Sequence, residues 1–305
     1  SRPKEIDFGR LVERFGTEEK CREYLEALRW PEGAVCPRCG KKATRIGTTG
    51  AWDSSCGYQF TVRVGTVLQD SKLPLWKWFV ATLLMCEARK GKSANEVRRL
   101  VGTSYKNAWF LTHRIREAMS QAANVEPLTG TVEIDETYIG GKPRNKRHGH
   151  KGPDPKHPKV TVLGAVERGG RIRLRVEHRG TNMGTLHQFV RENVHGDAPN
   201  IYTDQYAGYR GIGDANTKHE TVNHNAEEWV RGDVHTNTIE SAWSLFKRSV
   251  VGSYHHLSAK HLDKYLDEFE WRFNNRANPF LFRDTMKALI ESGTLTYSAL
   301  KERSS

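Results

Sequence analysis

The chain has 305 residues, which is enough for two or three domains with separate cores. Its 48 Lys and Arg residues outnumber its 36 Asp and Glu residues, and the net charge of +12 favours a polyanionic partner such as nucleic acid. A hydrophobic share of 37% excludes a wholly disordered chain. The longest apolar run, residues 73–86, contains Lys77 and is too short to cross a bilayer, so we expect no membrane partner.

The first 33 residues are predicted to be a helical segment, because "EEKCREYLEALRW" places Cys21, Leu25 and Leu28 at helical spacing. Residues 34–66 then hold three of the five cysteines. An odd number of cysteines, with three of them clustered, does not fit a disulfide framework. We therefore expect a protein of the reducing cytoplasm.

The cysteine segment, 34–66, begins like a zinc ribbon, with Cys36 and Cys39 forming a CxxC knuckle in "CPRCG". A ribbon needs a second knuckle, and here it reads "DSSC", with Asp53 in place of a cysteine before Cys56. Since Zn²⁺ accepts an Asp oxygen beside thiolates, we predict structural zinc on these three cysteines and Asp53. Two alternatives stay open: a three-cysteine site completed by a histidine or water, and a ribbon without metal.

Residues 67–122 are predicted to form a helix-turn-helix DNA-binding domain. "SANEVRRLVG" reads as a short helix with Ser93 as N-cap, Glu96 at capping-box spacing and Gly102 at its end. A second helix begins in "TSYKNAWFLTHRIREAM", and two helices joined by a tight glycine turn are typical of this motif. The candidate DNA-contacting residues at the start of the second helix are Ser104, Tyr105, Lys106 and Asn107. An ordinary helical hairpin that packs a core is the alternative.

Residues 123–278 alternate strand and helix patterns in the order β-β-β-α-β, a further short strand, then α. This order predicts an RNase H-like catalytic domain, in which helices flank a mixed five-stranded sheet. Residues 279–305 carry another amphipathic stretch, "FRDTMKALIESG", and are predicted to form a C-terminal helical tail. The predicted fold class is therefore multidomain α+β: a zinc ribbon, a helix-turn-helix and an RNase H-like α/β domain.

Three acids stand at telling positions in this order: Asp135 ends the first strand, Asp204 follows the fourth, and Glu240 lies in the first turn of the late helix. A carboxylate trio can hold two divalent ions that activate a water or a 3′-hydroxyl at a phosphodiester, and Mg²⁺ prefers such oxygen ligands. Each acid also has a structural interpretation. Glu133 is a rival of Asp135 on the same strand face, and Asp204 could start an Asx turn. Glu240 could close a capping box with Asn237.

Three stretches, "VEIDETYIGGK", "YTDQYAGY" and "HTNTIESAWSLFKRSVVGSYHHLSAKHLDKYLDEFEWRFNNR", resemble the DDE transposases of the insertion-sequence 1595 family, which carry an ISXO2-like transposase domain. The eukaryotic Merlin transposases are similar. In this sequence 35 residues lie between Asp204 and Glu240, a spacing that many DDE enzymes show. Lys247 stands seven positions after Glu240, followed by Arg248, and matches the Glu-x6-Lys pattern in which the basic residue meets transposon-end DNA. The resemblance covers nearly the whole chain.

The resemblance implies a reaction and its partners. Asp135, Asp204 and Glu240 are then catalytic residues that hold two Mg²⁺ or Mn²⁺ ions. Water cuts double-stranded DNA at the terminal inverted repeats, and the freed 3′-OH joins target DNA by transesterification. Two ends must be joined, so a homodimer on DNA is expected, in a prokaryotic cytoplasm and associated with the nucleoid. The alternatives are a domesticated DNA-binding regulator and a structure-specific RNase H-like nuclease.

Further DNA contacts are expected in a basic insertion, 141–159, between the first two strands of the catalytic domain. Its seven Lys and Arg residues and one Asp give it a net charge of +6. A solvated loop is the alternative. The candidate contacts within it are Lys142, Arg144, Lys146 and Arg147. His255 and His256 in "GSYHHLS" resemble a motif of the family, and we expect both near DNA.

Overall fold

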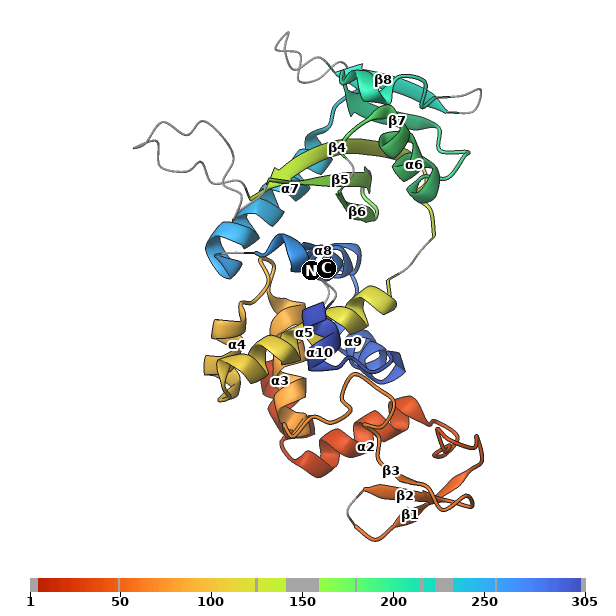
Figure 1. Cartoon of the computed structure of the whole chain (residues 1–305), viewed down its shortest axis with the longest axis vertical. Helices are drawn as coiled ribbons and strands as arrows, with labels where there is room; N and C mark the ends of the chain where they lie inside the picture. Colours follow the sequence, from red (N-terminus) through yellow and green to blue (C-terminus); the bar gives the residue numbers. More distant parts are fainter. Residues whose placement is uncertain are drawn as a thin grey trace. The chain divides into compact units, whose positions relative to one another are not determined.

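The computed structural model describes residues 5–48, 50–123, 126–140, 159–178, 180–213, 217–222, 233–255 and 257–302. The chain divides into two compact units, one formed by residues 1–123 with 275–305 and the other by residues 124–274 (Figure 1). No helix among the described residues has the length and apolar character needed to span a membrane.

Helices dominate the first unit. They are α1 (Phe8–Phe15), α2 (Glu18–Arg29), α3 (Leu75–Glu87), α4 (Ala94–Val101), α5 (Tyr105–Gln121), α9 (Leu281–Glu291) and α10 (Tyr297–Glu302). Local caps start the first two: Asp7 accepts a hydrogen bond from the Arg10 backbone N–H, and Thr17 from that of Lys20. Aromatic rings fill the core between the helices, with the ring of Phe79 4.9 Å from that of Phe15 and 5.9 Å from that of Phe282.

The C-terminal segment belongs to this first unit. α9 packs against α2, α3 and α5, and the Cys86 thiol donates to the Thr285 hydroxyl at 3.3 Å. From the sequence, residues 279–305 are predicted to be a separate C-terminal tail. Helical periodicity shows which face of a helix is apolar, but not which distant helices cover that face. The apolar face of α9 completes a core that the N-terminal helices begin.

The ribbon in this unit is a three-stranded antiparallel sheet of β1 (Ala43–Ile46), β2 (Ala51–Ser54) and β3 (Gln59–Phe60). The nearly buried Glu26 of α2 ties this sheet to the helices. Its carboxylate accepts hydrogen bonds from the Trp52 indole N–H and the Arg45 guanidinium, each at 3.1 Å.

The helices α4 and α5 form the pair that the sequence predicts. Ser93 and Glu96 make the full capping box at the start of α4, since each side chain accepts from the other's backbone N–H. Gly102 then ends α4 with φ +64°, in the left-handed region where glycine is the least strained residue. Ser104 caps α5 by accepting from the Asn107 backbone N–H at 3.2 Å.

The second unit is built on a five-stranded mixed sheet of β4 (Thr131–Ile139), β5 (Val160–Glu167), β6 (Ile172–Glu177), β7 (Asn200–Asp204) and β8 (Lys218–Val222). The strand order is β6-β5-β4-β7-β8. The three strands that come first in sequence pair antiparallel, whereas β7 and β8 add in parallel. The mixed five-stranded sheet predicted from the sequence is confirmed.

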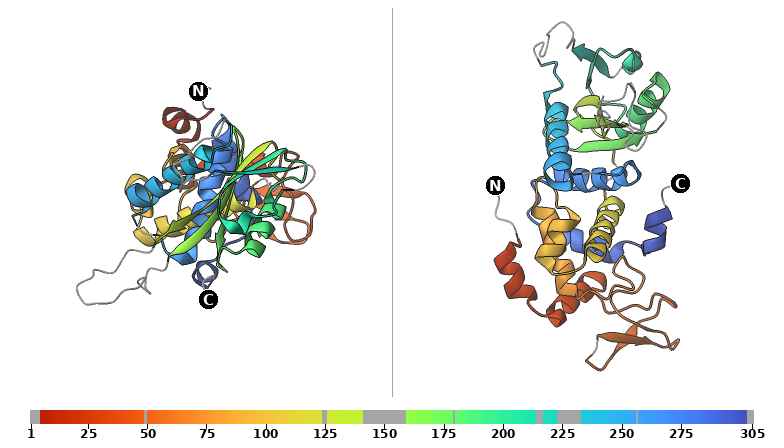
Figure 2. Two further views of the ribbon diagram at one scale, coloured as in Figure 1. Left: turned by 90° about the horizontal axis from the view of Figure 1, so that it is seen from above. Right: turned by 60° about the vertical axis from the view of Figure 1, so that its left-hand side comes forward.

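Helices cover both faces of this sheet (Figures 1 and 2). On one face α6 (Met183–Asn193) buries Leu186 and Phe189 against Val132 and Ile134 of β4. On the other face α7 (Asn237–Ser249) packs on β4 and β5, and α8 (Leu262–Asn274) packs on β6. Short turns η2 (Ala207–Tyr209), η4 (Val250–Tyr254) and η5 (Ala259–His261) connect the elements. Side chains alternate along β4, so odd-numbered residues of that strand face α7.

Candidate active site and metal centre

Two of the predicted acids lie side by side on neighbouring parallel strands. β4 and β7 pair with Thr131 opposite Asn200 and Glu133 opposite Tyr202. Asp135 lies in the middle of β4 and not at its end as predicted, because the strand continues to Ile139. Asp135 and Asp204 each stand two residues beyond the last of these pairs, so the register puts them at the same level on the same face. Asp204 ends β7, and its carboxylate accepts from the Tyr206 backbone N–H at 3.0 Å. The Asx turn considered as an alternative role for Asp204 is thus present and leaves its other oxygen for a ligand.

The Asp135 carboxylate is held by a tryptophan from α7. The Trp243 indole N–H donates to Asp135 Oδ2 at 3.0 Å. Gly164, which pairs with Asp135 on β5, makes room for this ring, because a Cβ there would lie 2.5 Å from the Trp243 ring. The hydrogen bond joins β4 to α7, which packs on one face of the sheet, and nothing in the local sequence around either residue predicts it.

Burial and negative neighbours raise the pKa of Asp135 to about 7. Removal of water is the largest cause, and the charges of Glu136 and Asp204 add to it, while the Trp243 hydrogen bond acts in the opposite direction. A carboxyl group held in this way binds a proton more tightly than an ordinary aspartate does. A divalent cation between the acids would relieve the same repulsion, so the environment fits metal binding.

The third acid lies across an open pocket from Asp135. Glu240 is an exposed residue in the first turn of α7, and its Oε1 accepts from the Thr236 hydroxyl at 3.0 Å. The pocket has a volume of about 620 Å³, and its lining includes Asp135, Glu240, Lys247 and Arg248. Asp204 is not among the lining residues, but its charge acts on two of them, Asp135 and Glu136. The structure therefore places Asp135 and Glu240 at one pocket with two cations, and Asp204 close enough for its charge to act on Asp135.

Glu136 is an acid of this pocket that the sequence analysis did not single out. It follows Asp135 directly, and the Tyr209 hydroxyl donates to its carboxylate at 2.5 Å. Burial raises the pKa of Glu136, the Tyr209 hydrogen bond lowers it, and the charge of Asp204 raises it further. The stretch "IDETY" shows the acid itself, but its partner lies 73 residues away and gives no local signal.

Glu133, the rival of Asp135 on the same strand face, has a different environment. Its side chain has no exposure, and it accepts hydrogen bonds from Arg168 and from the first turn of α7. A carboxylate fully engaged with donors does not face the pocket. The capping box of Glu240 with Asn237 is absent, since Asn237 is already helical and Thr236 is the N-cap.

The other predicted DNA contacts are spread over both units. Tyr105 is exposed at the start of α5, and the Lys106 ammonium lies 4.8 Å from the centre of the Tyr297 ring. His255 has φ +60°, and its Nδ1 lies 3.1 Å from the Val251 carbonyl oxygen. The predicted contacts that lie outside the described residues are Lys142, Arg144, Lys146, Arg147 and His256.

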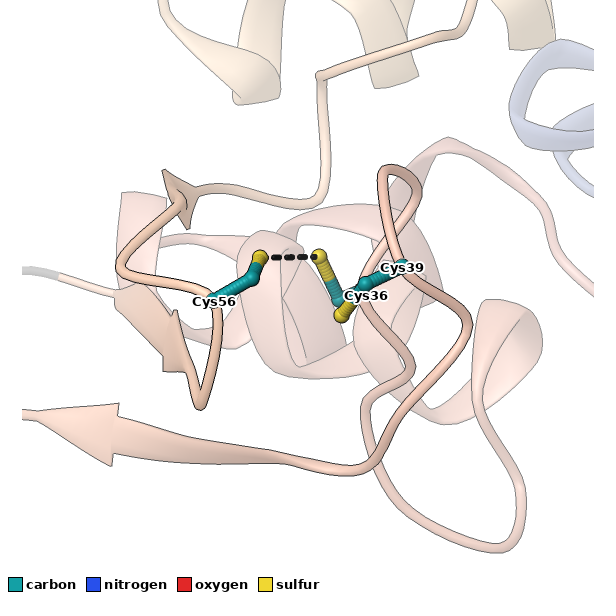
Figure 3. Close-up of side chains that lie close together, drawn as sticks. All are labelled: Cys36, Cys39 and Cys56. Atoms are coloured by element: carbon teal, nitrogen blue, oxygen red, sulfur yellow. Dashed lines mark hydrogen bonds between the residues drawn. The ribbon is translucent and has the colours of Figure 1, made fainter.

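The three cysteines of the ribbon converge (Figure 3). Cys36 and Cys39 come from the turn before β1 and Cys56 from the turn after β2, and their sulfur atoms all lie within 4.8 Å of one another. The Cys36 and Cys56 sulfurs are 3.9 Å apart, close to the ~3.8 Å between two thiolates on a tetrahedral zinc with Zn–S near 2.3 Å. These side chains fit a structural zinc ion. Among the described residues this is the one such group of potential metal ligands.

Asp53 does not join the cysteines as the sequence predicts. The neighbouring residue on β2, the buried Ser54, points to the cluster instead, with its hydroxyl 3.0 Å from Cys39 Sγ. Because successive side chains of a strand face opposite ways, Asp53 points away. The contact of the Ser54 hydroxyl and a backbone hydrogen bond at Lys41 lower the pKa of the Cys39 thiol to about 6. Residue spacing puts Asp53 at the position of the missing cysteine, but the register of β2 turns Ser54 inward.

Comparison with known proteins agrees with this arrangement. Residues 127–274 match the model of the ISXO2-like transposase domain, and residues 16–59 match that of a transposase zinc-ribbon domain. The chain is 26% identical over 298 residues to an uncharacterized protein in transposable element ISH50 of Halobacterium salinarum, covering 92% of this chain and 98% of the relative. It is 31% identical over 91 residues to an uncharacterized transposase-like protein of Haemophilus influenzae, covering 30% and 72%.

Solved structures with partial similarity include two complexes of the Mos1 transposase. A pre-cleavage Mos1 transpososome matches with a TM-score of 0.28 and 12% identity over 68% of this chain and 76% of that chain. The Mos1 strand transfer complex matches with a TM-score of 0.29 and 13% identity over 72% and 78%. Similarity at this level does not by itself establish a shared fold. The two domain matches do establish the family: the chain belongs to the insertion-sequence 1595 transposases, with a transposase zinc ribbon followed by an ISXO2-like transposase domain.

Proposed function

We propose that the protein is a DDE transposase that cleaves DNA at the terminal inverted repeats of its element and joins the freed 3′-OH ends to target DNA. The second unit is then an RNase H-like catalytic domain, because its strand order and the direction of each strand are those expected for that fold. Asp135, Asp204 and Glu240 are the proposed catalytic residues. The observation that carries the proposal is the proximity of the acids: the charge of Asp204 acts on Asp135, and Asp135 and Glu240 line the same pocket.

The trio suits two Mg²⁺ or Mn²⁺ ions, which prefer carboxylate oxygens and meet here a site where burial and neighbouring negative charges raise the pKa of Asp135. When bound, such ions supply an activated water or 3′-hydroxyl and stabilise the leaving oxygen of the phosphodiester. The chain's own residues fix the ligands: Trp243 holds one oxygen of Asp135, and the Tyr206 N–H holds one of Asp204. Each acid can then keep its remaining oxygen directed at the ions.

Lys247 and Arg248 are proposed to bind the DNA backbone beside the scissile phosphate. They stand two turns after Glu240 on α7, and both line the pocket that contains Asp135. Cations at this place offset the repulsion between a polyanion and four nearby carboxylates. They hold the backbone while the acids act at the phosphorus.

DNA recognition is assigned to the first unit and the basic insertion. α4 and α5 are proposed to act as a helix-turn-helix, supported by the glycine turn and by the exposed Tyr105 at the start of α5. The ribbon, stabilised by zinc on Cys36, Cys39 and Cys56, and the insertion 141–159 would add contacts to double-stranded DNA. A homodimer would hold the two ends together, in the cytoplasm of a prokaryotic cell at the nucleoid.

The test uses purified protein, Mg²⁺ and a labelled duplex carrying the inverted repeat of the element. We expect cleavage at the end and strand transfer into a plasmid. Asp135→Asn, Asp204→Asn and Glu240→Gln should each lose at least ~10²-fold in rate while keeping DNA affinity. Asp197→Asn, an exposed acid of the same unit, is the matched control and should be unaffected. Unimpaired cleavage by the three variants would contradict the assignment. Binding without cleavage in either metal would favour a DNA-binding regulator.

A further inference from the structure

Glu133 is a fully buried carboxylate with a ring of donors around it. Its Oε1 accepts from Arg168 Nε at 2.7 Å and from the Thr238 hydroxyl at 2.9 Å. Its Oε2 accepts from the backbone N–H groups of Thr238 and Ile239 at 2.8 and 3.0 Å. The His235 ring lies 3.3 Å away. Loss of this carboxylate would leave several buried donors without an acceptor, and this would cost free energy of folding.

These contacts replace a local cap at the start of α7. The N-cap residue, Thr236, provides no side-chain hydrogen bond to the helix backbone, because its hydroxyl donates to Glu240. Glu133 comes from a different element more than a hundred residues away and accepts from two N–H groups of the first turn, those of Thr238 and Ile239. Its negative charge also lies at the positive end of the helix dipole.

Arg168, the ion-pair partner of Glu133, holds the segment that leads into α7. From the turn between β5 and β6 it donates to the carbonyl oxygens of Asp233 and His235, at 2.8 and 3.0 Å. Its guanidinium also lies 4.8 Å from the centre of the Tyr202 ring on β7. The entry to α7 is thus fixed to β4 by the Glu133–Arg168 ion pair and to β7 by the contact of Arg168 with the Tyr202 ring.

The contacts of Glu133 link the two sides of the pocket, β4 and α7. Glu133 lies two residues before Asp135 on β4, and Ile239, whose N–H it binds, directly precedes Glu240 on α7. One helical turn beyond Glu240, Trp243 returns a hydrogen bond to Asp135. α7 is therefore attached to β4 at two points, one on either side of Glu240.

We propose that Glu133 is a positioning residue that sets the separation of Asp135 and Glu240, and so determines divalent-ion affinity and the rate of the cutting step without contributing to DNA affinity. This inference rests on the proposed transposase function. Its physical basis is that the first turn of a helix frays when its N–H groups lose their acceptors. Glu240 lies in that turn, so its carboxylate would sample positions too far from Asp135 to share a cation.

The test compares Glu133→Gln with the wild type in the full-length protein. Glutamine keeps the size of the side chain, but it removes the charge and places an NH₂ group among donors. We expect the half-saturating Mg²⁺ concentration for cleavage to rise 10- to 100-fold, the range seen when residues that orient metal ligands are changed. The dissociation constant for the inverted-repeat duplex should stay within about twofold. Asp197→Asn, which removes a charge from an exposed site, should change neither quantity.

A second measurement is independent of catalysis. Hydrogen exchange at the Thr238 and Ile239 amides of the metal-free protein should quicken at least ~10-fold in Glu133→Gln, while amides in the centre of α7 keep their protection. Mn²⁺ binding followed by electron paramagnetic resonance should weaken in parallel with the Mg²⁺ requirement. If the wild type does not cleave DNA, the proposed function fails, and the exchange and Mn²⁺ measurements still decide the role of Glu133.

A milder variant covers the case in which Glu133→Gln does not fold. Thr238→Ala removes one hydroxyl donor from Glu133 and leaves the backbone bonds in place. It should shift the Mg²⁺ requirement in the same direction by a few-fold. Wild-type metal dependence and wild-type exchange in the variants that fold would overturn the inference. An equal loss of DNA binding and cleavage would also overturn it, since the role would then be structural only.

Discussion

The cysteine cluster of the ribbon and the acidic pocket of the second unit are both candidate metal sites, and they are built in opposite ways. Three thiols from two turns converge within 4.8 Å, with a serine hydroxyl beside them. The acids come instead from two strands and a helix, with Asp135 and Glu240 at an open pocket, and burial together with the neighbouring acids raises the pKa of Asp135. A set of soft thiolate ligands suits a permanent structural ion. An open set of hard carboxylate ligands suits ions that arrive with substrate.

Chelation should give the largest contrast between the two sites. Brief treatment with EDTA is expected to abolish cleavage completely, because the open carboxylate site releases its ions, while about one zinc per chain stays bound. Mg²⁺ added back should restore full activity. Metal analysis beside the cleavage assay checks both outcomes, and loss of zinc together with activity would break the contrast.

Ligand substitution should sharpen the assignment of the ribbon. Cys36→Ser is expected to weaken zinc binding at least ~100-fold, because it removes a thiolate from the cluster. Asp53→Ala is the matched variant and should bind zinc like the wild type, since Asp53 faces away from the sulfurs. Zinc competition with a chromophoric chelator measures both. Weakened binding in Asp53→Ala would return the aspartate to the ligand set.

The same aspartate shows what sequence can and cannot predict. Short-range features were accessible: the capping box of Ser93 and Glu96, the helix end at Gly102 and the order of strands and helices along the chain all follow from local pattern. The inward residue of "DSSC" depends on the register of β2, and a shift of one residue exchanges Asp53 with Ser54. Spacing alone therefore chose the wrong side chain.

Contacts between residues far apart in the chain could not be predicted from the sequence for a related reason. Glu133 and Asp135 share one face of β4, and the pattern "VEIDET" does not say which of them meets a helix N-terminus and which meets a second carboxylate. The contact of Trp243 with Asp135 depends on the packing of α7 over Gly164. The sequence indicates the acids as a set, but the contacts that each one makes follow from tertiary packing.

Titration should also distinguish the two sites. With a pKa of about 7 against 3.8 for an ordinary Asp, folded metal-free protein keeps a proton on Asp135 that the unfolded chain releases. The free energy of unfolding should therefore fall as pH rises from about 4 to 7, by at most ~1.4 kcal/mol per pH unit, and then level off. Saturating Mg²⁺ should flatten the slope. Urea unfolding at several pH values tests this, with Asp135→Asn as the variant that loses the slope.

The smallest effect concerns the cations of the pocket. Lys247→Ala should weaken DNA binding several-fold and lower the slope of log K against log salt by about 1, because one phosphate contact is lost. Lys218→Ala, whose ammonium is paired with Glu220 at 3.0 Å on the edge strand β8, is the matched control. Equal slopes for both variants would remove Lys247 from the DNA-binding surface.

The central claim is that Asp135, Asp204 and Glu240 together hold the ions that act on DNA. Its most direct test is the anomalous scattering of Mn²⁺ in crystals of the protein bound to an element-end duplex. We predict two peaks roughly 4 Å apart, with Asp135 between them and with Asp204 and Glu240 each on one ion. Ions bound elsewhere, or a site that leaves out Asp204 or Glu240, would contradict this account.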